Sequence, residues 1–157
     1  MQISPLQLSA IWVGKVLLEP AVEPFVPTTQ IDIETTPSFR RNNDDPRNWI
    51  VELRVAFRSA SDQKAAYEGS VEMTGAFVIS GDLPEEKQLQ MIAVNAPSIL
   101  YSSVREFIAM LTAHGQHGKF VLPSVSFVDQ KLLFPTPVVQ KGEPESKKQS
   151  AEPTRSS

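Results

Sequence analysis

The strongest constraint on the fold is a pair of neighbouring segments in which apolar and polar side chains alternate. Nearly every second residue is apolar in NWIVELRVAFRSA, residues 48–60, and the pattern returns in residues 67–79. A period of two predicts strands with one buried face, and the short polar link favours an antiparallel hairpin. Gly69 and Gly75 lie on the apolar side, which predicts a bulge or a close approach by an element packed over the sheet.

Two more strands are expected nearer the N-terminus. Residues 6–20, LQLSAIWVGKVLLEP, are apolar on both faces, so we expect a partner as well as the core to cover this strand. Residues 29–35, TQIDIET, predict a short alternating strand in which Ile31 and Ile33 point to one side.

The link between these two strands is rich in proline. Residues 19–28, EPAVEPFVPT, carry prolines at positions 20, 24 and 27. Because proline fixes φ and lacks a backbone N–H, this spacing excludes a regular element and predicts a stiff extended crossover. The crossover carries the apolar residues Phe25 and Val26.

Helical features begin after Gly81. Pro84 and the two glutamates that follow it are typical of a helix start. Asn95 and Pro97 predict an interruption, after which a stronger helix carries one apolar stripe. The stripe consists of Ile99, Leu100, Val104, Phe107, Ile108 and Leu111.

Both histidines lie where this helix is expected to end, in AMLTAHGQHGKF, residues 109–120. Gly115 stands where a left-handed helix cap would fall. His114 would occupy the last turn, where a protonated ring interacts favourably with the helix dipole, and His117 would lie in the loop beyond. A zinc site needs a third or fourth ligand, and the neighbouring sequence offers none. We therefore predict a helix end here, not a metal or catalytic site.

The C-terminal part is divided by composition. Residues 119–134 predict a short extended stretch and then a last helix of about two turns, which Pro135 and Pro137 would stop. From Lys141 the chain is polar, mixed in charge and free of aromatic residues. This composition predicts a domain over residues 1–140 and a disordered polar tail over 141–157.

Composition narrows the class of protein. The 157 residues are 41% hydrophobic, which is enough for one domain with a core. A net charge of −3 gives no general attraction for nucleic acid or an anionic membrane. There is no cysteine, hence no disulfide or thiolate site. With no basic leader and only short apolar runs, we expect a cytoplasmic protein with no direct membrane insertion.

Catalytic motifs are missing from the sequence. It contains no GxSxG elbow, no glycine-rich phosphate loop and no Cys–His pair. Asp44 and Asp45 stand among basic residues in a polar run that favours a solvated turn. We expect neither an enzyme nor a bound cofactor or metal. The alternative is an active site assembled from distant residues, which a turnover dependent on His114 or His117 would support.

The remaining signal is a surplus of apolar surface on the strand at 6–20, the crossover, the strand at 29–35 and the long helix. One interpretation is that these residues simply form the core, which suits the strands. For the crossover and the helix, contacts between subunits or binding of apolar ligands are equally good interpretations.

The run from Asn95 to Phe127 resembles the helix and following segment of SecB-type export chaperones. The resemblance extends to the strands and spans about residues 8–134. Its features in chain order are IDIE at 31–34, VELRVAF at 51–57, GAFVISG at 75–81, Ile99-Leu100, Val104-Arg105-Glu106, Gly115 and LPSVSF at 122–127.

The resemblance implies an α+β fold with a four-stranded antiparallel sheet, a long helix and a short C-terminal helix, assembled as a tetramer from two dimers. Members of the family bind unfolded polypeptides in apolar grooves without ATP and keep them competent for export. The client-binding positions implied here are Phe25, Val26, Ile31, Ile33, Leu132, Leu133 and Phe134. The implied oligomer interface consists of Ile11, Val13, Ile99, Leu100, Val104, Ile108 and Leu111.

The resemblance also bears on partners. Export chaperones of this family present acidic side chains on the sheet to SecA, the motor of the translocase. Glu19 matches one such docking position, whereas Lys15 and Ser70 stand where further acids would be expected. Some SecB-like proteins serve instead as chaperones of the antitoxin in a toxin–antitoxin system. Two roles therefore stay open, preprotein export and a dedicated antitoxin chaperone.

Overall fold

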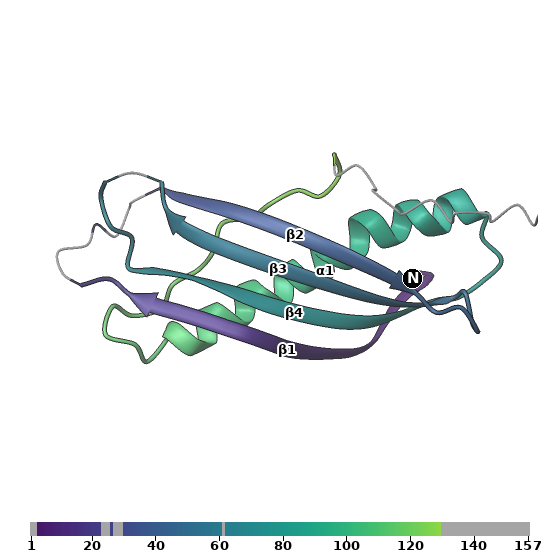
Figure 1. Ribbon diagram of the computed structural model, residues 1–157, viewed down its shortest axis with the longest axis horizontal. Helices are drawn as coiled ribbons and strands as arrows, with labels where there is room; N and C mark the ends of the chain where they lie inside the picture. The colour runs from purple at the N-terminus through teal and green to yellow at the C-terminus, as the bar shows by residue number, and fades with distance from the viewer. Residues whose placement is uncertain (1–2, 23–25, 27–29, 61, 130–157) are drawn as a thin grey trace, which may run out of the picture.

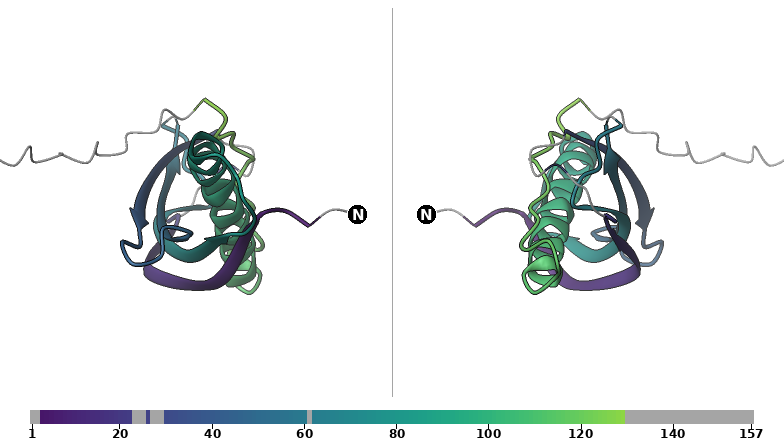
Figure 2. Two further views of the ribbon diagram at one scale, coloured as in Figure 1. Left: turned by 90° about the vertical axis from the view of Figure 1, so that its right-hand side faces the viewer. Right: turned by 90° about the vertical axis from the view of Figure 1, so that its left-hand side faces the viewer.

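A computed structural model describes residues 3–22, 26, 30–60 and 62–129 of the chain. Four antiparallel strands form one sheet in the order β1-β4-β3-β2, and a long helix lies across one face of it (Figure 1). Seen along its length, the sheet curves around the helix, which lies on its concave side (Figure 2). The elements are β1 (Leu6–Pro20), β2 (Ile31–Arg41), β3 (Asn48–Ser59), β4 (Tyr67–Ile79) and α1 (Glu85–Thr112).

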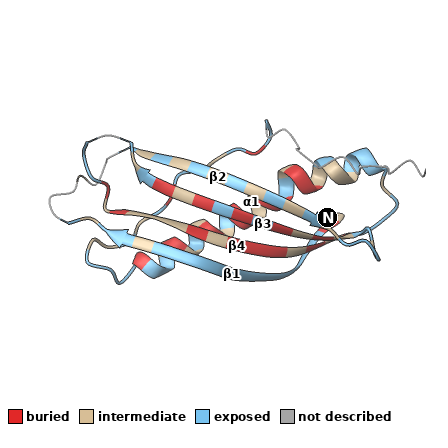
Figure 3. Ribbon diagram, in the orientation of Figure 1, coloured by how far each residue is buried: buried red, intermediate tan, exposed pale blue. Residues whose placement is uncertain are grey.

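The two central strands are those with the clearest alternation in sequence. β3 and β4 pair as the predicted antiparallel hairpin, with Trp49 opposite Phe77 and Val55 opposite Val71. Buried and less buried residues alternate along β3 because one face of the sheet packs against α1 (Figure 3). The α+β class with a four-stranded antiparallel sheet is thereby confirmed.

Both glycines on the apolar side of β4 mark close approaches, and at Gly75 the approach comes from an element packed over the sheet, as predicted. A Cβ atom on Gly69 would clash with the backbone carbonyl of Leu17 in β1. A Cβ atom on Gly75 would lie 2.6 Å from the ring of Phe77 and 2.9 Å from the side chain of Leu100 in α1. Glycine is required at the second position because the helix packs directly over it.

The second strand is longer than predicted. The expected strand ended at Thr35, but β2 continues to Arg41 through Pro37. Proline is tolerated because β2 is an edge strand, and Pro37 stands at a position whose backbone N would point away from β3. Phe39 then adds a further apolar side chain to the core.

The predicted helix interruption is wrong, because α1 runs unbroken from Glu85 to Thr112 with Pro97 inside it. Ile92, Ala96 and Leu100 form one buried stripe with a spacing of four across the proline. Proline inside a helix costs about 3 kcal/mol. Burial of this stripe against the sheet offsets that cost. Helix propensity read from the sequence does not include this packing energy.

The helix end is in the expected region but has a different cap. Gly115 is not left-handed, and the left-handed glycine of this loop is Gly118, with φ +75°. Gly115 is needed for another reason, since a Cβ there would clash with the hydroxyl of the buried Tyr67. His114 lies just beyond the helix and is exposed.

The core lies between α1 and the sheet, and it contains three of the residues that the family resemblance implies for an oligomer interface. Leu100, Val104 and Ile108 have no exposed surface. A side chain without exposed surface cannot contact a second subunit while the protomer is folded, so the interface prediction is wrong for these three. Ile99 is half-buried and Leu111 is exposed, so both remain available.

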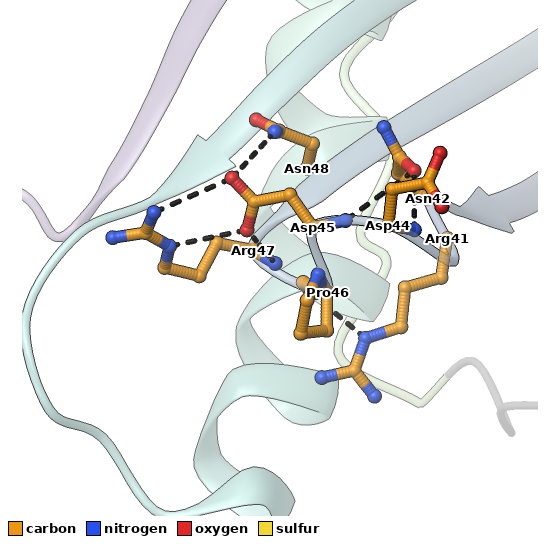
Figure 4. A network of polar contacts seen from close by, with 7 residues as sticks. All are labelled: Arg41, Asn42, Asp44, Asp45, Pro46, Arg47 and Asn48. Carbon is orange, nitrogen blue, oxygen red and sulfur yellow. Dashed lines mark hydrogen bonds and ion pairs between the residues drawn. The ribbon is translucent and has the colours of Figure 1, made fainter.

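The acidic pair in the β2–β3 link forms a turn, as the sequence indicated. The carboxylate of Asp45 accepts hydrogen bonds from the Arg47 guanidinium at 3.2 and 3.3 Å and from the Asn48 amide at 3.0 Å (Figure 4). These bonds hold the pKa of Asp45 below its usual value, and the side-chain hydrogen bond from Arg47 is the largest cause. The Asn42 side chain accepts from the Asp44 backbone N–H at 2.8 Å. Each group has a structural role in closing the turn.

The last predicted elements fall beyond the described residues. The C-terminal helix, the end of the 1–140 domain and the tail at 141–157 all lie in or include residues 130–157, which are outside that range. Within the described part of the chain, no helix is long and apolar enough to cross a membrane.

Candidate functional site

The first strand is the most exposed apolar element among the described residues. Only Leu6 of β1 is buried and only Leu18 is half-buried (Figure 3). Ile11, Trp12 and Val13 are 41%, 47% and 39% exposed. β1 is an edge strand and α1 touches it at few places. A long apolar edge of this kind is a template for pairing with another chain unless something covers it.

The opposite edge belongs to β2, and its backbone has a definite pattern of outward groups. The Ala60 N–H donates to the Gln30 carbonyl at 2.9 Å, and the Asn42 N–H donates to the Asn48 carbonyl at 2.9 Å. Pairing is uninterrupted between these points. Even-numbered residues of β2 therefore bond to β3, and odd-numbered residues turn their N–H and C=O groups outward. Ile31, Ile33 and Thr35 present such groups, whereas Pro37 has no N–H to present.

The side chains at this edge stand where the sequence placed them. Ile31 and Ile33 are half-buried and pack against the core on the α1 side of the sheet. Each therefore keeps some exposed surface beside the outer edge of β2, which has no further strand next to it in the described part of the chain. Val26, in the crossover, is half-buried as well. Of the other client-binding positions, Phe25, Leu132, Leu133 and Phe134 lie outside the described residues.

A groove of about 440 Å³ runs beside the start of β2. One wall is the strand itself, and the other is the chain that returns after α1. Val121, which is 51% exposed, and the exposed Pro123 are the lining residues of this second wall. The lining residues are Gln30, Ile31, Asp32, Ala60, Val121 and Pro123.

The second wall is held in place by side chains of α1. The Tyr101 hydroxyl donates to the Pro123 carbonyl at 2.6 Å, and the Arg105 guanidinium donates to the Leu122 carbonyl at 2.8 Å. Leu122 and Phe127 are buried beneath it. Because these contacts come from a rigid helix, the groove is formed before any ligand arrives.

The crossover is fixed at two points by its main chain. The Ala21 N–H donates to the Ala66 carbonyl at 2.9 Å, and the Val26 N–H donates to the Lys64 carbonyl at 2.9 Å. Both acceptors lie in the β3–β4 link and the residues just before β4. At Ala21 and Val26, the described positions of the crossover with these bonds, the main chain therefore lies beside that link.

The convex face of the sheet carries charged side chains and a second groove of about 470 Å³. Asp32 stands opposite Arg58, and Arg54 stands opposite Glu72. Opposite charges on neighbouring strands compensate one another, so this face has no single sign. Glu19, the predicted docking residue, is exposed on β1 and lines this groove.

One carboxylate of this face is bound to the protein itself. Glu68 accepts hydrogen bonds from the hydroxyl of Ser59 and from its backbone N–H, the latter at 3.0 Å. The Ser59 hydroxyl bond, the largest cause, and the backbone bond hold the pKa of Glu68 below its usual value. Ser59 also accepts the Ala65 N–H at 2.9 Å. Glu68 thus closes the β3–β4 link, a role that sequence patterning did not indicate.

The two histidines have different surroundings. His117 is half-buried, and its Nε2 atom lies 2.8 Å from the Ala21 carbonyl oxygen. His114 is exposed. In the part of the chain that the structure describes, no three His, Cys, Asp or Glu side chains gather closely enough to hold a metal ion.

The family model described as "Preprotein translocase subunit SecB" matches residues 4–134. The protein-export protein SecB of Psychrobacter arcticus is 26% identical over 98 residues, which cover 62% of this chain and 64% of that relative, slightly less than two thirds of it. The protein-export protein SecB of Acinetobacter baumannii is 24% identical over 128 residues, covering 80% of this chain and 84% of the relative.

Among solved structures, the fold is similar to that of the Mycobacterium tuberculosis SecB-like chaperone Rv1957, in complex with a ChAD peptide from the HigA1 antitoxin. The TM-score is 0.60 at 18% identity, and the alignment covers 76% of this chain and 90% of the other. At 18% identity, this similarity supports a shared fold and nothing further. The family model covers most of the residues, and on that match the chain belongs to the SecB family.

Proposed function

We propose that this protein is an ATP-independent chaperone that binds unfolded polypeptides in the groove between β2 and the chain after α1. The observation that carries the proposal is the combination of a groove with a strand edge at Ile31, Ile33 and Thr35 whose outward backbone groups pair with no other strand among the described residues. Membership of the SecB family supports a chaperone role. An unfolded chain offers the two things that such a site can bind, namely apolar side chains and free backbone groups.

The binding follows from main-chain pairing and apolar contact together. An extended client segment adds to the free edge of β2, where each backbone hydrogen bond contributes about 0.5–1.5 kcal/mol. Each apolar client side chain that is fully buried contributes about 1.5–3 kcal/mol. Backbone pairing does not depend on the amino-acid sequence of the client, so the site recognises an extended conformation and exposed apolar side chains. Many weak contacts along one client then give useful affinity without a nucleotide.

A second copy of the chain is the proposed partner of β1. The exposed apolar residues of this strand have a position and length suited to strand pairing across subunits. Ile11 and Val13, with Ile99 and Leu111 of α1, would contribute to that interface. The resemblance described above favours a tetramer built from two dimers.

The client class proposed first is unfolded preproteins bound for export, with Glu19 contributing to SecA docking and the protein acting in the cytoplasm. The second candidate is a dedicated antitoxin chaperone. It is favoured by the mixed charge of the convex face, where Lys15, Arg54 and Arg58 dilute the acids. Titration of the protein with purified SecA, and with an antitoxin encoded beside its gene, separates the two. Tight SecA binding favours export, and preference for the antitoxin favours the dedicated role.

The groove itself is tested with two substitutions of the same kind. Val121→Asp places a charge in the groove, whereas Val128→Asp places it on the same segment outside the lining residues, at a side chain that is 71% exposed. We expect Val121→Asp to weaken binding of a reduced and alkylated, permanently unfolded protein about tenfold, because the charge must be desolvated. Fluorescence anisotropy measures the affinity.

The Val128→Asp variant should bind that client as the unsubstituted protein does, and both variants should keep the same melting temperature. Equal affinity for all three proteins would place the client elsewhere. Failure of the unsubstituted protein to bind the client, or to prevent its aggregation at equal concentration, would contradict the chaperone proposal.

A further inference from the structure

The outer edge of β2 is divided by a proline. Because even-numbered residues bond to β3, the odd-numbered residues Ile31, Ile33 and Thr35 each turn one N–H and one C=O outward. Pro37 stands at the next outward position, opposite Leu53 of β3. It offers a carbonyl oxygen there but no N–H. The row of outward donors is therefore interrupted in the middle of the strand.

The half of β2 before Pro37 adjoins the groove. Ile31 and Asp32 are the residues of β2 that line it, and Val121 and Pro123 line it from the other wall. No residue of β2 after Asp32 contributes to that lining. The groove and the uninterrupted outward donors therefore lie at the same end of the strand, where one bound segment can reach both.

The half of β2 after Pro37 is tied to other elements of the protomer. The Arg41 guanidinium donates from Nε to the Pro46 carbonyl at 2.8 Å (Figure 4) and from Nη1 to the Glu85 carboxylate, at the start of α1, at 2.7 Å. Its Cζ atom lies 5.3 Å from the centroid of the Trp49 ring. The two halves of one strand thus have different surroundings, and Pro37 separates them.

A proline at an edge strand limits what can pair with that edge. A segment added beside Ile31, Ile33 and Thr35 finds a donor at every outward position. If the same segment continued past Pro37, one of its carbonyl groups would face a position with no N–H. That carbonyl would give up a hydrogen bond to water and gain none in return. Pairing is therefore favourable up to Pro37 and unfavourable across it.

We propose that Pro37 is a specificity-determining residue that ends the strand which a client adds to β2. This inference rests on the proposed chaperone function. The segment bound at this edge is then short, about five extended residues opposite positions 31–35. Unfolded polypeptides offer such short segments in many places. A long continuous strand from another folded protein gains nothing from its further length.

The test uses the full chain with two substitutions at one site. Pro37→Ala restores an N–H at the interrupted position, and Pro37→Thr does the same with a residue that favours strands. Pro46→Ala is the matched control, because it removes an exposed proline that lies in the β2–β3 turn, outside β2. The melting temperature should fall slightly in all three variants, since proline restricts the unfolded chain.

Two quantities are measured with the reduced and alkylated client: its affinity, and amide hydrogen exchange along β2. In the unsubstituted protein the client should slow exchange at residues 31–35 and leave the outward amide of Arg41 unchanged. In Pro37→Ala and Pro37→Thr it should also slow the new amide at position 37. Affinity should rise about threefold to tenfold, as one added hydrogen bond predicts. Pro46→Ala should bind as the unsubstituted protein does.

Three results would overturn the inference. The first is client protection of the Arg41 amide in the unsubstituted protein, because the added strand then passes Pro37. The second is an unprotected amide at position 37 with unchanged affinity in both variants at that site. The third is an equal gain in Pro46→Ala. If the client binds but protects none of residues 31–35, strand addition is wrong and the inference with it. If the unsubstituted protein does not bind the client at all, the proposed function itself fails.

Discussion

β1 and β3 are strands of one sheet with similar apolar content and opposite surroundings. In β3, Val51, Leu53 and Val55 have no exposed surface, while Ile11, Trp12 and Val13 of β1 are 39–47% exposed. β3 has a strand on each side and α1 over one face, whereas β1 has one neighbouring strand and little helix over it. An apolar side chain therefore stabilises the protomer only where another element of the protomer covers it. The uncovered strand is then available for a second chain.

The same substitution in the two strands should have opposite consequences. Val55→Asp places an unpaired charge in the core and should unfold the protomer, at a cost above about 4 kcal/mol. Val13→Asp stands at an exposed edge and should leave the protomer folded while it separates the subunits of the assembly. Circular dichroism measures folding, and light scattering measures molar mass.

An unchanged molar mass for Val13→Asp would contradict the role of β1 as an interface. A folded Val55→Asp variant would contradict the position of β3 in the core. Either result would show that the substituted residue does not have the surroundings, covered in β3 or uncovered in β1, that are assigned to it.

A second pair of substitutions extends the contrast to the backbone of β2. Glu34→Pro removes an N–H that bonds to β3 and should destabilise the protomer by about 3 kcal/mol. Thr35→Pro removes an outward N–H, so the protomer should lose much less stability. Client affinity should nevertheless fall about threefold to tenfold, because the client loses one main-chain hydrogen bond. Urea unfolding and client titration measure the two effects.

Equal destabilisation by the two prolines would show that positions 34 and 35 do not differ in their bonding to β3, and a larger loss for Thr35→Pro would show that the inward and outward positions have been exchanged. A stable Thr35→Pro variant with full client affinity would argue against strand addition and leave apolar contact as the basis of binding.

The smallest expected effect concerns Glu68, on the convex face. The pKa of Glu68 is lowered in the folded protein. Its contribution to stability is therefore fully present above the pKa that Glu68 has in the unfolded chain, and it is lost as the pH falls through the pKa that Glu68 has in the folded protein. Glu68→Gln should cost less than about 1 kcal/mol at neutral pH, because the carboxylate is partly exposed. In acid the difference from the unsubstituted protein should vanish. Urea unfolding from pH 7 to pH 3 measures it, and a constant difference would show that the Ser59 bond does not depend on charge.

Much of the fold was predictable because its signals are local. Alternation placed β3 and β4, and the two glycines marked the close approaches to β1 and α1. The passage of α1 through Pro97 was not predictable, because the compensation comes from packing against the sheet. For the same reason, the apolar stripe of α1 was divided wrongly between core and interface, since periodicity cannot say which partner covers a face.

The candidate site was predictable in part. Ile31 and Ile33 follow from alternation and resemblance, but the second wall at Val121 and Pro123 depends on how the chain returns along α1. The contact between His117 and Ala21 joins residues almost a hundred positions apart, and no sequence pattern marks it. Which backbone groups of β2 point outward depends on its pairing register with β3, and no local sequence pattern gives that register.

The most direct test of the account is amide hydrogen exchange along β2 with and without a bound unfolded client. The reduced and alkylated client should slow exchange at the outward amides of Ile31, Ile33 and Thr35, while the inward amides of Asp32 and Glu34 change little, because β3 already protects them. If the client binds and the outward amides exchange as fast as before, the client does not add to β2 and the central claim is contradicted.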